Sequence, residues 1–250
     1  MEIDGRTILV TGASRGIGAA TARHLAARGA CVVLAARSGA EALAAEIGER
    51  ALPVACDVAD WAQVTEAVAA AEARFGAVDG LVNNAGLIDP IARLEDSDPA
   101  AWARVVAVNL TGAYHALRAV VPGMVARGAG VVVNVSSGAA TSALEGWSHY
   151  CATKAALLSL TRVADVELRD RGVSVVGLSP GTVATGMQEA IRDSRMNPVS
   201  KLDWSAHIPA SDVAVAVEWL MRDGAVAYAG TDFSLKSPEG RAEAGLVPLP

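Results

Sequence analysis

Tyr150 and Lys154 are the two residues whose types and spacing point most directly to chemistry. On a helix, residues four positions apart lie on the same face, one turn from each other. An ammonium group beside a phenol favours the phenolate, so we expect Lys154 to lower the pKa of Tyr150 from its usual value of about 10. The tyrosine would then serve as an acid or a base near neutral pH. The same spacing also occurs where a surface lysine lies beside a half-buried tyrosine, so the interpretation depends on the rest of the chain.

Two further polar residues belong to the same region of a predicted sheet. Ser137 comes 13 residues before Tyr150, just after an apolar run at 131–135 that predicts a strand. Ligands of open α/β sheets bind beyond the carboxyl ends of the strands, so the Ser137 hydroxyl is placed to hold a substrate carbonyl oxygen. Asn109 lies on the long helix expected before this strand, and Asn83-Asn84-Ala85-Gly86 ends the strand expected at 80–83.

A glycine-rich turn follows the first expected strand and leads into a helix. Glycine lacks a Cβ, so the backbone can turn tightly and approach a pyrophosphate closely. The N-terminus of the helix then offers free N–H groups and the positive end of its dipole. A strand-to-helix turn can be purely structural, but this position favours dinucleotide binding. The residues expected to contact the phosphates are Gly12, Ser14, Arg15, Gly16, Ile17 and Gly18.

Arg37 and Ser38 follow the second expected strand, where an NAD site usually has an acidic residue. A carboxylate there bonds the ribose 2′-hydroxyl, whereas Arg37 can pair with a 2′-phosphate and Arg15 can flank it. Both arginines could also be solvated and without a role. The missing acid and the two cations together favour NADP(H) as the cofactor.

Short apolar, β-branched runs alternate with longer Ala-rich amphipathic stretches along the chain. Strands that are apolar on both faces are covered by helices on both faces, and repeated units of this kind form a doubly wound parallel sheet. We therefore predict an α/β fold, a single-domain Rossmann-type sheet in three layers (α/β/α) over residues 1–250. Strands are expected at 7–10, 31–35, 52–56, 80–83, 131–135, 173–178 and 232–235. Helices are expected at 16–28, 41–48, 60–75, 98–126 with a break or bend, 148–171, 187–193 and 211–221. Asp60, Asp98 and Ser211 are the expected N-caps of three of them.

Composition argues against several classes of protein. The net charge is -6 with no basic stripe, so we expect no nucleic-acid partner. The longest uncharged stretch, 128–144, is interrupted by polar residues and glycines, and no signal peptide fits before the first strand, so we expect no membrane partner. The sparse cysteines Cys31, Cys56 and Cys151 fit reduced thiols in the cytoplasm. The four histidines are isolated, so no metal site is expected.

Together these motifs resemble the typical core branch of the short-chain dehydrogenase/reductase family. The matching pieces cover roughly residues 7–185 in the family's order. They are the turn at 11–18, Asp57-Val58, the Asn-Asn-Ala-Gly at 83–86, Asn109, Ser137, Tyr150 with Lys154, and Pro180-Gly181 followed by Thr185.

The resemblance implies a role for each residue of the catalytic set. Tyr150 would protonate a carbonyl oxygen as hydride arrives, or deprotonate an alcohol in the reverse direction, and Ser137 would polarise that oxygen. Lys154 would bond the nicotinamide ribose and tune Tyr150. Asn109 would anchor a water that links Lys154 to solvent. Along the cofactor, the resemblance implies contacts from Asp57 to the adenine amino group, with Val58 nearby, and from Asn84, Ala85, Gly86, Pro180, Gly181, Val183 and Thr185.

The residues around Thr185–Gln188 and Ile191-Arg192 are similar to the subgroup with sepiapterin reductase and the benzil reductases. This likeness implies NADPH-dependent reduction of a ketone or dicarbonyl. The chain departs from many members after Asp232, where Lys236-Ser237 replaces a Gly-Gly tail. The segment 186–209 is the candidate for a mobile substrate loop, and Leu144, Trp147, Met187 and Ile191 would give the pocket an apolar wall.

Two other functions remain as alternatives. One is an NAD(P)-dependent dehydrogenase of an unknown secondary alcohol, against which the missing acid after the second strand argues. The other is an NADP-binding sensor without turnover, which would usually lack the tyrosine or the lysine. The resemblance also implies a homodimer or homotetramer formed through the helices expected at 98–126 and 148–171.

Overall fold

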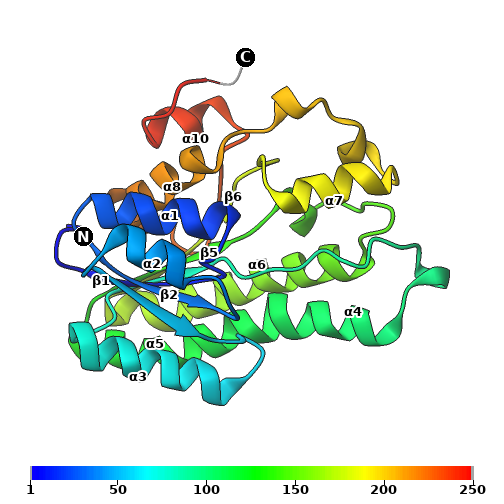
Figure 1. Cartoon of the computed structure of the whole chain (residues 1–250). Helices are drawn as coiled ribbons and strands as arrows, with labels where there is room; N and C mark the ends of the chain where they lie inside the picture. The colour runs from blue at the N-terminus through cyan, green and yellow to red at the C-terminus, as the bar shows by residue number, and fades with distance from the viewer. Residues whose placement is uncertain (1, 249–250) are drawn as a thin grey trace.

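The computed structural model describes residues 2–248, in which one seven-stranded sheet carries helices on both faces (Figure 1). All neighbouring strands are parallel, in the order β3-β2-β1-β4-β5-β6-β7. The predicted doubly wound α/β sheet is confirmed. The strand order reverses between β1 and β4, which opens a crevice at their carboxyl ends. The strands are β1 (Thr7–Thr11), β2 (Cys31–Ala36), β3 (Ala51–Ala55), β4 (Gly80–Asn83), β5 (Gly130–Val135), β6 (Val173–Ser179) and β7 (Asp232–Ser234).

Two layers of helices cover the sheet. In Figure 1, α1 (Gly16–Ala27) and α8 (Ala210–Trp219) lie above it, and α3 (Trp61–Phe75) and α5 (Gly112–Arg127) lie below it. The strands supply apolar side chains to both layers: Ile8 and Val10 join the core beneath α1 and α8, and Leu9 between them joins the opposite core. This alternation is the physical reason for the continuous apolar runs in the sequence. The remaining helices are α2 (Glu41–Ile47), α4 (Pro99–Val106), α6 (Ser148–Leu168), α7 (Gly186–Ser194), α9 (Ala225–Ala227) and α10 (Pro238–Glu243).

Two helix starts follow the capping residues predicted for them. Asp60 Oδ1 accepts a hydrogen bond from Ala62 N at 2.9 Å, and Asp98 Oδ1 accepts one from Ala101 N at 2.7 Å. The expectation that the 211–221 helix begins with a Ser211 cap is wrong, because α8 begins one residue earlier, after Pro209. The short helix α10 was not expected, although Ser237 caps it and Pro238 opens it.

The helix expected at 98–126 is interrupted, as predicted, and the interruption is a π-helical turn, Ala107–Thr111, between α4 and α5. Such a turn inserts one extra residue into a helix and is often found at functional sites. Here it contains Asn109. The sequence indicated a break at this place but not its type.

A buried polar chain fixes α6 beneath the sheet. Asn134 of β5 is fully buried, its Oδ1 accepts a hydrogen bond from Asn83 Nδ2 at 2.9 Å, and its Nδ2 donates to Thr161 Oγ1 on α6 at 2.9 Å. Leaving a buried donor or acceptor unpaired costs about 1–3 kcal/mol. A slip of α6 against β5 would therefore be unfavourable, and α6 is the helix that carries Tyr150 and Lys154.

The segment 186–209 contains α7 and two short 3₁₀ turns, Pro198–Lys201 and Trp204–Ala206. Asn197 Nδ2 donates to the carbonyl oxygen of Glu145 at 3.0 Å, so the segment is tied to the chain just before α6. Its mobility stays a prediction. Within residues 2–248, no helix has the length and apolar character needed to cross a bilayer.

Candidate active site

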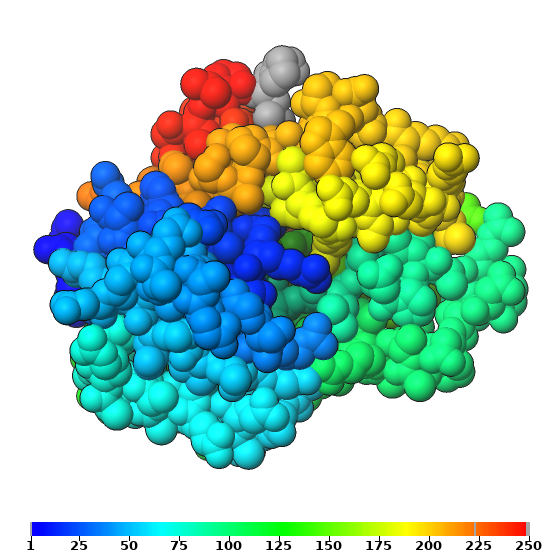
Figure 2. Space-filling view, viewed as in Figure 1, coloured from blue at the N-terminus to red at the C-terminus, as the bar shows by residue number. Residues whose placement is uncertain are grey.

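A cleft with a volume of about 720 Å³ opens at the carboxyl ends of the strands. In Figure 2 it is the hollow near the centre of the molecule, between the blue N-terminal part and the yellow segment that contains α7. Its volume is in the range of ligand pockets in proteins. The cleft is lined by every residue of the predicted catalytic and cofactor sets except Gly18 and Asn109.

The glycine turn at one end of the cleft is held against the end of β4. Asn84 Nδ2 donates to the carbonyl oxygens of Thr11, at 2.9 Å, and Gly12, at 3.2 Å. A Cβ on Gly12 would lie 2.9 Å from Ala85 Cα, and one on Gly18 would overlap the Gly12 carbonyl oxygen. Glycine is thus required at both positions, and Gly18, which does not line the cleft, acts through packing.

The start of α1 fits a phosphate group. Its N-cap residue, Arg15, has an extended backbone and no side-chain hydrogen bond to the helix, so no side chain accepts from the first-turn N–H groups. These groups and the helix dipole suit an anion. The close-packed turn, this helix end and the long cleft fit a dinucleotide with its pyrophosphate beside Gly16 and Ile17.

Arg15, Arg37 and Ser38 are exposed and line the same end of the cleft. Within residues 2–248 neither arginine makes an ion pair shorter than 4.0 Å. Asp57 also lines this end, and its Oδ2 pairs with Arg104 Nη2 at 2.5 Å. Although burial raises the pKa of Asp57, hydrogen bonds from Arg104 and from Ala59 N hold it below its usual value. The carboxylate is therefore charged and already partnered.

Tyr150 and Ser137 meet in the middle of the cleft. Ser137 follows β5 and its Oγ accepts from Ala139 N at 3.1 Å, while its hydroxyl forms a hydrogen bond with the Tyr150 hydroxyl. Two hydroxyl groups thus face the same small volume at the carboxyl end of the sheet. A carbonyl oxygen entering there can accept a hydrogen bond from each of them.

Lys154 lies one helical turn after Tyr150 and is only 5% exposed. Its Nζ donates to the carbonyl oxygen of Val135 at 2.6 Å and lies 5.6 Å from the centroid of the Tyr150 ring. Burial lowers the pKa of Lys154 to about 8, and the nearby Asp232 carboxylate opposes this shift. The ammonium is therefore held at the end of β5, within electrostatic reach of the phenol.

The expectation that the pKa of Tyr150 lies below its usual value of about 10 is wrong for this arrangement. Burial raises the pKa of Tyr150 to about 12, and the hydrogen bond from Ser137 only partly offsets it. The cause is that the phenol is removed from water while Lys154 points to Val135. At neutral pH the tyrosine is protonated, which is the form a proton donor needs.

Asn109 lies beneath the cleft and not in its wall. Its Oδ1 accepts from Leu87 N at 2.7 Å, and its Nδ2 donates to Leu87 O at 2.8 Å and to Thr153 Oγ1 at 3.3 Å. Both ends of the side chain are therefore used to join the π turn, the segment after β4 and α6. The expected water contact of Asn109 stays a prediction.

The far half of the cleft is lined by apolar side chains. Leu144, Trp147, Met187 and Ile191 all line it, as predicted. Trp147 lies edge-on to Tyr150, with 5.6 Å between the ring centroids. The wall can therefore accept the carbon skeleton of a substrate beside the reacting oxygen.

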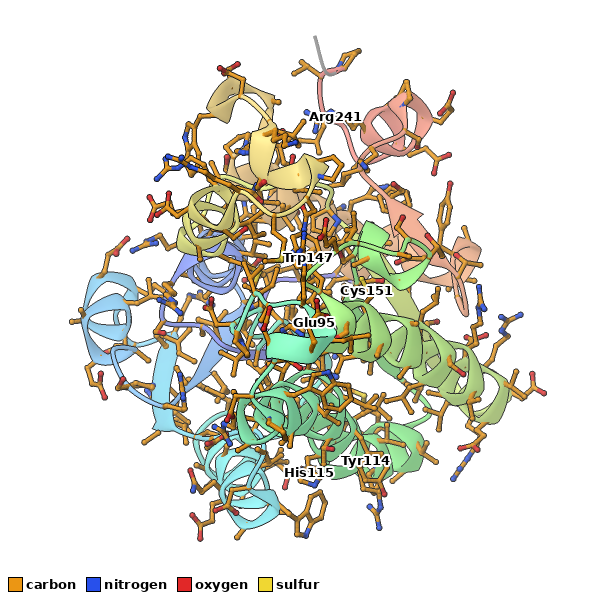
Figure 3. All side chains as sticks on the ribbon, turned by 90° about the vertical axis from the view of Figure 1, so that its right-hand side faces the viewer. Glu95, Tyr114, His115, Trp147, Cys151 and Arg241 are labelled. Atoms are coloured by element: carbon orange, nitrogen blue, oxygen red, sulfur yellow. The ribbon has the colours of Figure 1, made fainter. Side chains whose placement is uncertain are left out.

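The cysteine and the histidines close to Tyr150 or Asn109 in the sequence pack against, or hydrogen-bond with, other parts of the fold. Cys151 packs against the apolar cluster that contains Trp147, and His149 contacts Ile88 O through Nε2 at 2.6 Å. Figure 3 shows Cys151 beside Trp147 and shows His115 and Tyr114 far from them, at the bottom of the view. His115 contacts Val58 O through Nδ1 at 3.0 Å.

Asp232 is a residue of the site that the sequence did not assign. It opens β7, and its Oδ2 accepts a hydrogen bond from Ser136 Oγ at 3.2 Å. Its Oδ1 is buried and has no hydrogen-bond partner within residues 2–248. Burial raises the pKa of Asp232 to about 6, against the Ser136 hydrogen bond and the charges of Lys154 and Arg162. The available signal was a carboxylate directly before the apolar Phe233 of the last expected strand.

Replacing Asp232 by Asn tests this burial. Because the folded-state pKa of about 6 exceeds the ordinary 3.8, the folded protein binds this proton more tightly, and the associated stability is lost as the pH rises through about 6. We expect the unfolding free energy of Asp232→Asn, relative to wild type, to increase by up to about 3 kcal/mol between roughly pH 4 and pH 7. Urea denaturation across this range measures it, with the exposed Asp170→Asn as control. A pH-independent difference would contradict the assigned burial.

Comparison with known proteins agrees with this geometry. The family model described as short chain dehydrogenase matches residues 6–196. Cis-4-hydroxycyclohexanecarboxylate dehydrogenase from Sinomonas cyclohexanicum is 38% identical over 229 residues, which cover 88% of this chain and 90% of that protein. The 3-ketoacyl-(acyl-carrier-protein) reductase from Brucella melitensis, complexed with NADH, has a TM-score of 0.83 at 33% identity, covering 93% of this chain and 97% of the other. Levodione reductase has a TM-score of 0.86 at 30% identity, covering 96% and 99%. The chain is therefore a member of the short chain dehydrogenase family, a nicotinamide-dependent oxidoreductase.

Proposed function

We propose that the protein is an NADPH-dependent reductase of a ketone or dicarbonyl. The observation that carries the proposal is the buried contact between Ser137 and Tyr150, with Lys154 behind it, in a cleft whose other end carries Arg15 and Arg37. The cofactor supplies hydride when it is bound. The protein residues orient the carbonyl and provide the proton.

The proton path begins at the tyrosine. The carbonyl oxygen accepts hydrogen bonds from the Ser137 and Tyr150 hydroxyls, and Tyr150 gives up its proton as negative charge develops on that oxygen. The high pKa of Tyr150 keeps it protonated until this moment. Lys154, whose ammonium lies near the ring, stabilises the phenolate left behind, and Asn109 at the π turn is proposed to connect this end to solvent through water.

Tyr150→Phe removes the proton donor and little else. We expect turnover to fall by at least about 100-fold because a positioned acid contributes that much or more, while NADPH binding changes less than about threefold. Initial rates of NADPH oxidation and a fluorescence titration measure the two effects. Tyr228→Phe, at a half-buried tyrosine that does not line the cleft, serves as the matched control. Near-normal turnover in Tyr150→Phe would remove the tyrosine from the mechanism.

The preference for NADP(H) rests on the end of β2. Arg37 and Ser38 line the cleft there, and Asp57, the acidic residue that also lines this end, is occupied by Arg104. A 2′-phosphate would meet the Arg37 and Arg15 guanidinium groups, which suit it geometrically. The NADH bound to the Brucella relative favours a second candidate, an NAD-linked alcohol dehydrogenase on the same site.

Arg37→Asp separates these two candidates. We expect the ratio of kcat/KM with NADPH to that with NADH to fall by at least about tenfold, since the new carboxylate repels a 2′-phosphate and accepts from a 2′-hydroxyl. Steady-state kinetics with both cofactors give the ratio. An exposed arginine outside the cleft, Arg171→Asp, is the control. An unchanged ratio would exclude Arg37 from the phosphate site, and a wild-type preference for NADH would favour the second candidate.

The apolar wall fits a ketone or dicarbonyl with a compact hydrocarbon body. The site does not define which hydrocarbon body the substrate has. We also propose a cytoplasmic location, which agrees with the three free cysteine thiols, because thiols stay reduced in the cytoplasm. The segment 186–209 is proposed to admit the substrate, because α7 supplies Met187 and Ile191 to the wall. No nucleic-acid or membrane partner forms part of the proposal.

We also propose that the protein is a homodimer or homotetramer that pairs through α5 and α6. Val166 and Val163 of α6 are 82% and 51% exposed, and Tyr114 of α5 is 49% exposed. Exposed large apolar residues on neighbouring helices mark contact surfaces. The small residues Ala152 and Ala155 face outward on the same helix and allow close approach.

Val166→Glu tests the oligomer. We expect the mass in solution to fall to that of a smaller assembly or of the monomer, because a carboxylate in the centre of an apolar contact is desolvated without a partner. Sedimentation velocity measures the mass. Val226, also 82% exposed but on α9, gives the control Val226→Glu. A monomeric wild-type protein would contradict the proposal directly.

A further inference from the structure

Lys236 is a charged residue of the cleft that the proposed mechanism does not use. It follows Leu235 just after β7, at the place where the sequence departs from a Gly-Gly tail, and it lines the same cleft as Tyr150. Lys236 is exposed, and within residues 2–248 it forms no ion pair. The ammonium is therefore available to a ligand.

The side chain of Lys236 extends across Gly181. A Cβ on Gly181 would lie 3.0 Å from Lys236 Cγ, 3.6 Å from Cδ and 3.9 Å from Cε, so the aliphatic stem runs along this residue. Gly181 has a φ of +80°, which suits glycine and leaves room for the stem. The lysine stem thus lies along Gly181 in the wall of the cleft.

The charges that line the cleft are unequally distributed. Asp57 is the acidic residue among its lining residues, and it is paired with Arg104 at the β2–β3 end. Around Tyr150, Pro180 and α7 the lining residues include Lys154 and Lys236 but no Asp or Glu. The protein as a whole has a net charge of -6, so a cationic cleft is a local feature and not a consequence of composition.

We propose that Lys236 binds an anionic group of the substrate, and that the substrate is an oxo acid, a ketone that carries a carboxylate some distance from the reacting carbonyl. This inference rests on the proposed function, since it names the substrate class of the same site. The lysine determines specificity and takes no part in proton transfer. The reacting carbonyl lies at Ser137 and Tyr150, and the carboxylate lies towards β7.

Matched acids and esters test the inference. The probes are 3-oxobutanoate, 4-oxopentanoate and 4-oxocyclohexanecarboxylate, each beside its methyl ester, with NADPH in excess. Wild type is expected to show a kcat/KM for at least one acid about five- to twentyfold above that for its ester, the effect of one charge pair in a partly exposed site. Lys236→Gln should abolish this difference by lowering only the acid's kcat/KM, Lys236→Arg should retain it, and Lys236→Glu should reverse it.

Two controls separate the possible causes. Arg171→Gln removes an exposed cation that lies outside both the cleft and the segment 186–209, and it should leave the acid preference unchanged. The Kd of NADPH should be the same in wild type and Lys236→Gln. If that variant weakens NADPH binding and slows acids and esters equally, the lysine serves the cofactor and the inference is wrong. Equal kcat/KM values for acids and esters in wild type would overturn it as well.

A binding measurement keeps the inference distinct from the proposed function. Calorimetric titration of the NADPH-loaded protein with cyclohexanecarboxylate, and with its methyl ester, requires no turnover. Preferential binding of the acid that Lys236→Gln abolishes would support the anion site even if no ketone is reduced, in which case only the proposed reaction fails. Equal binding of acid and ester would reject the anion site even if ketones are reduced.

Discussion

Lys154 carries its ammonium group into the interior, and much of the active end of the sheet is arranged around that group. Its Nζ donates to the carbonyl oxygen of Val135, the last residue of β5, and the Asp232 carboxylate at the start of β7 supplies the opposing charge. A buried ammonium without such partners would destabilise the fold by several kcal/mol or would give up its proton. Ser136 follows Val135 and donates a hydrogen bond from its Oγ to Asp232, and the next residue, Ser137, lines the cleft. The Ser137 hydroxyl is thus positioned by the same strand end that holds the lysine.

The sheet itself was predictable because its physical signal is strong. Strands such as β1 present apolar side chains to both layers, and this demands helices above and below. Once the strands are parallel, every carboxyl end lies at the same edge, so Ser137, Asn84 and Pro180 had to meet there. Capping residues such as Asp60 and Asp98 fixed helix starts within a residue, whereas Ser211 failed because propensity at one position does not decide where tertiary packing begins a helix.

The sequence could not reveal the direction of the Tyr150 pKa shift or the hydrogen-bond partners of the Asn109 amide. The spacing correctly predicted that the Tyr150 and Lys154 side chains lie close together, but the predicted direction of the tyrosine pKa shift was wrong, because spacing says nothing about how deeply a phenol is buried. Asn109 was recognised as a site residue, yet its amide is used to hold Leu87 and Thr153 together. Both outcomes depend on contacts between segments far apart in the chain, and no local pattern encodes them.

The contribution of β7 shows how a short element can shape a site. It has three residues and pairs only with β6, through Gly177, Leu178 and Ser179. That register places Asp232 beside Gly177 and near Lys154. It also brings Lys236, two residues after β7, against Gly181. A Cβ on Gly177 would lie 2.7 Å from Asp232 Oδ1, so the glycine is what allows the carboxylate to enter. β7 and the two residues after it therefore place a negative charge beneath Lys154 and a positive charge in the wall of the cleft. The first charge balances the buried ammonium, which leaves the second unbalanced and open to a substrate.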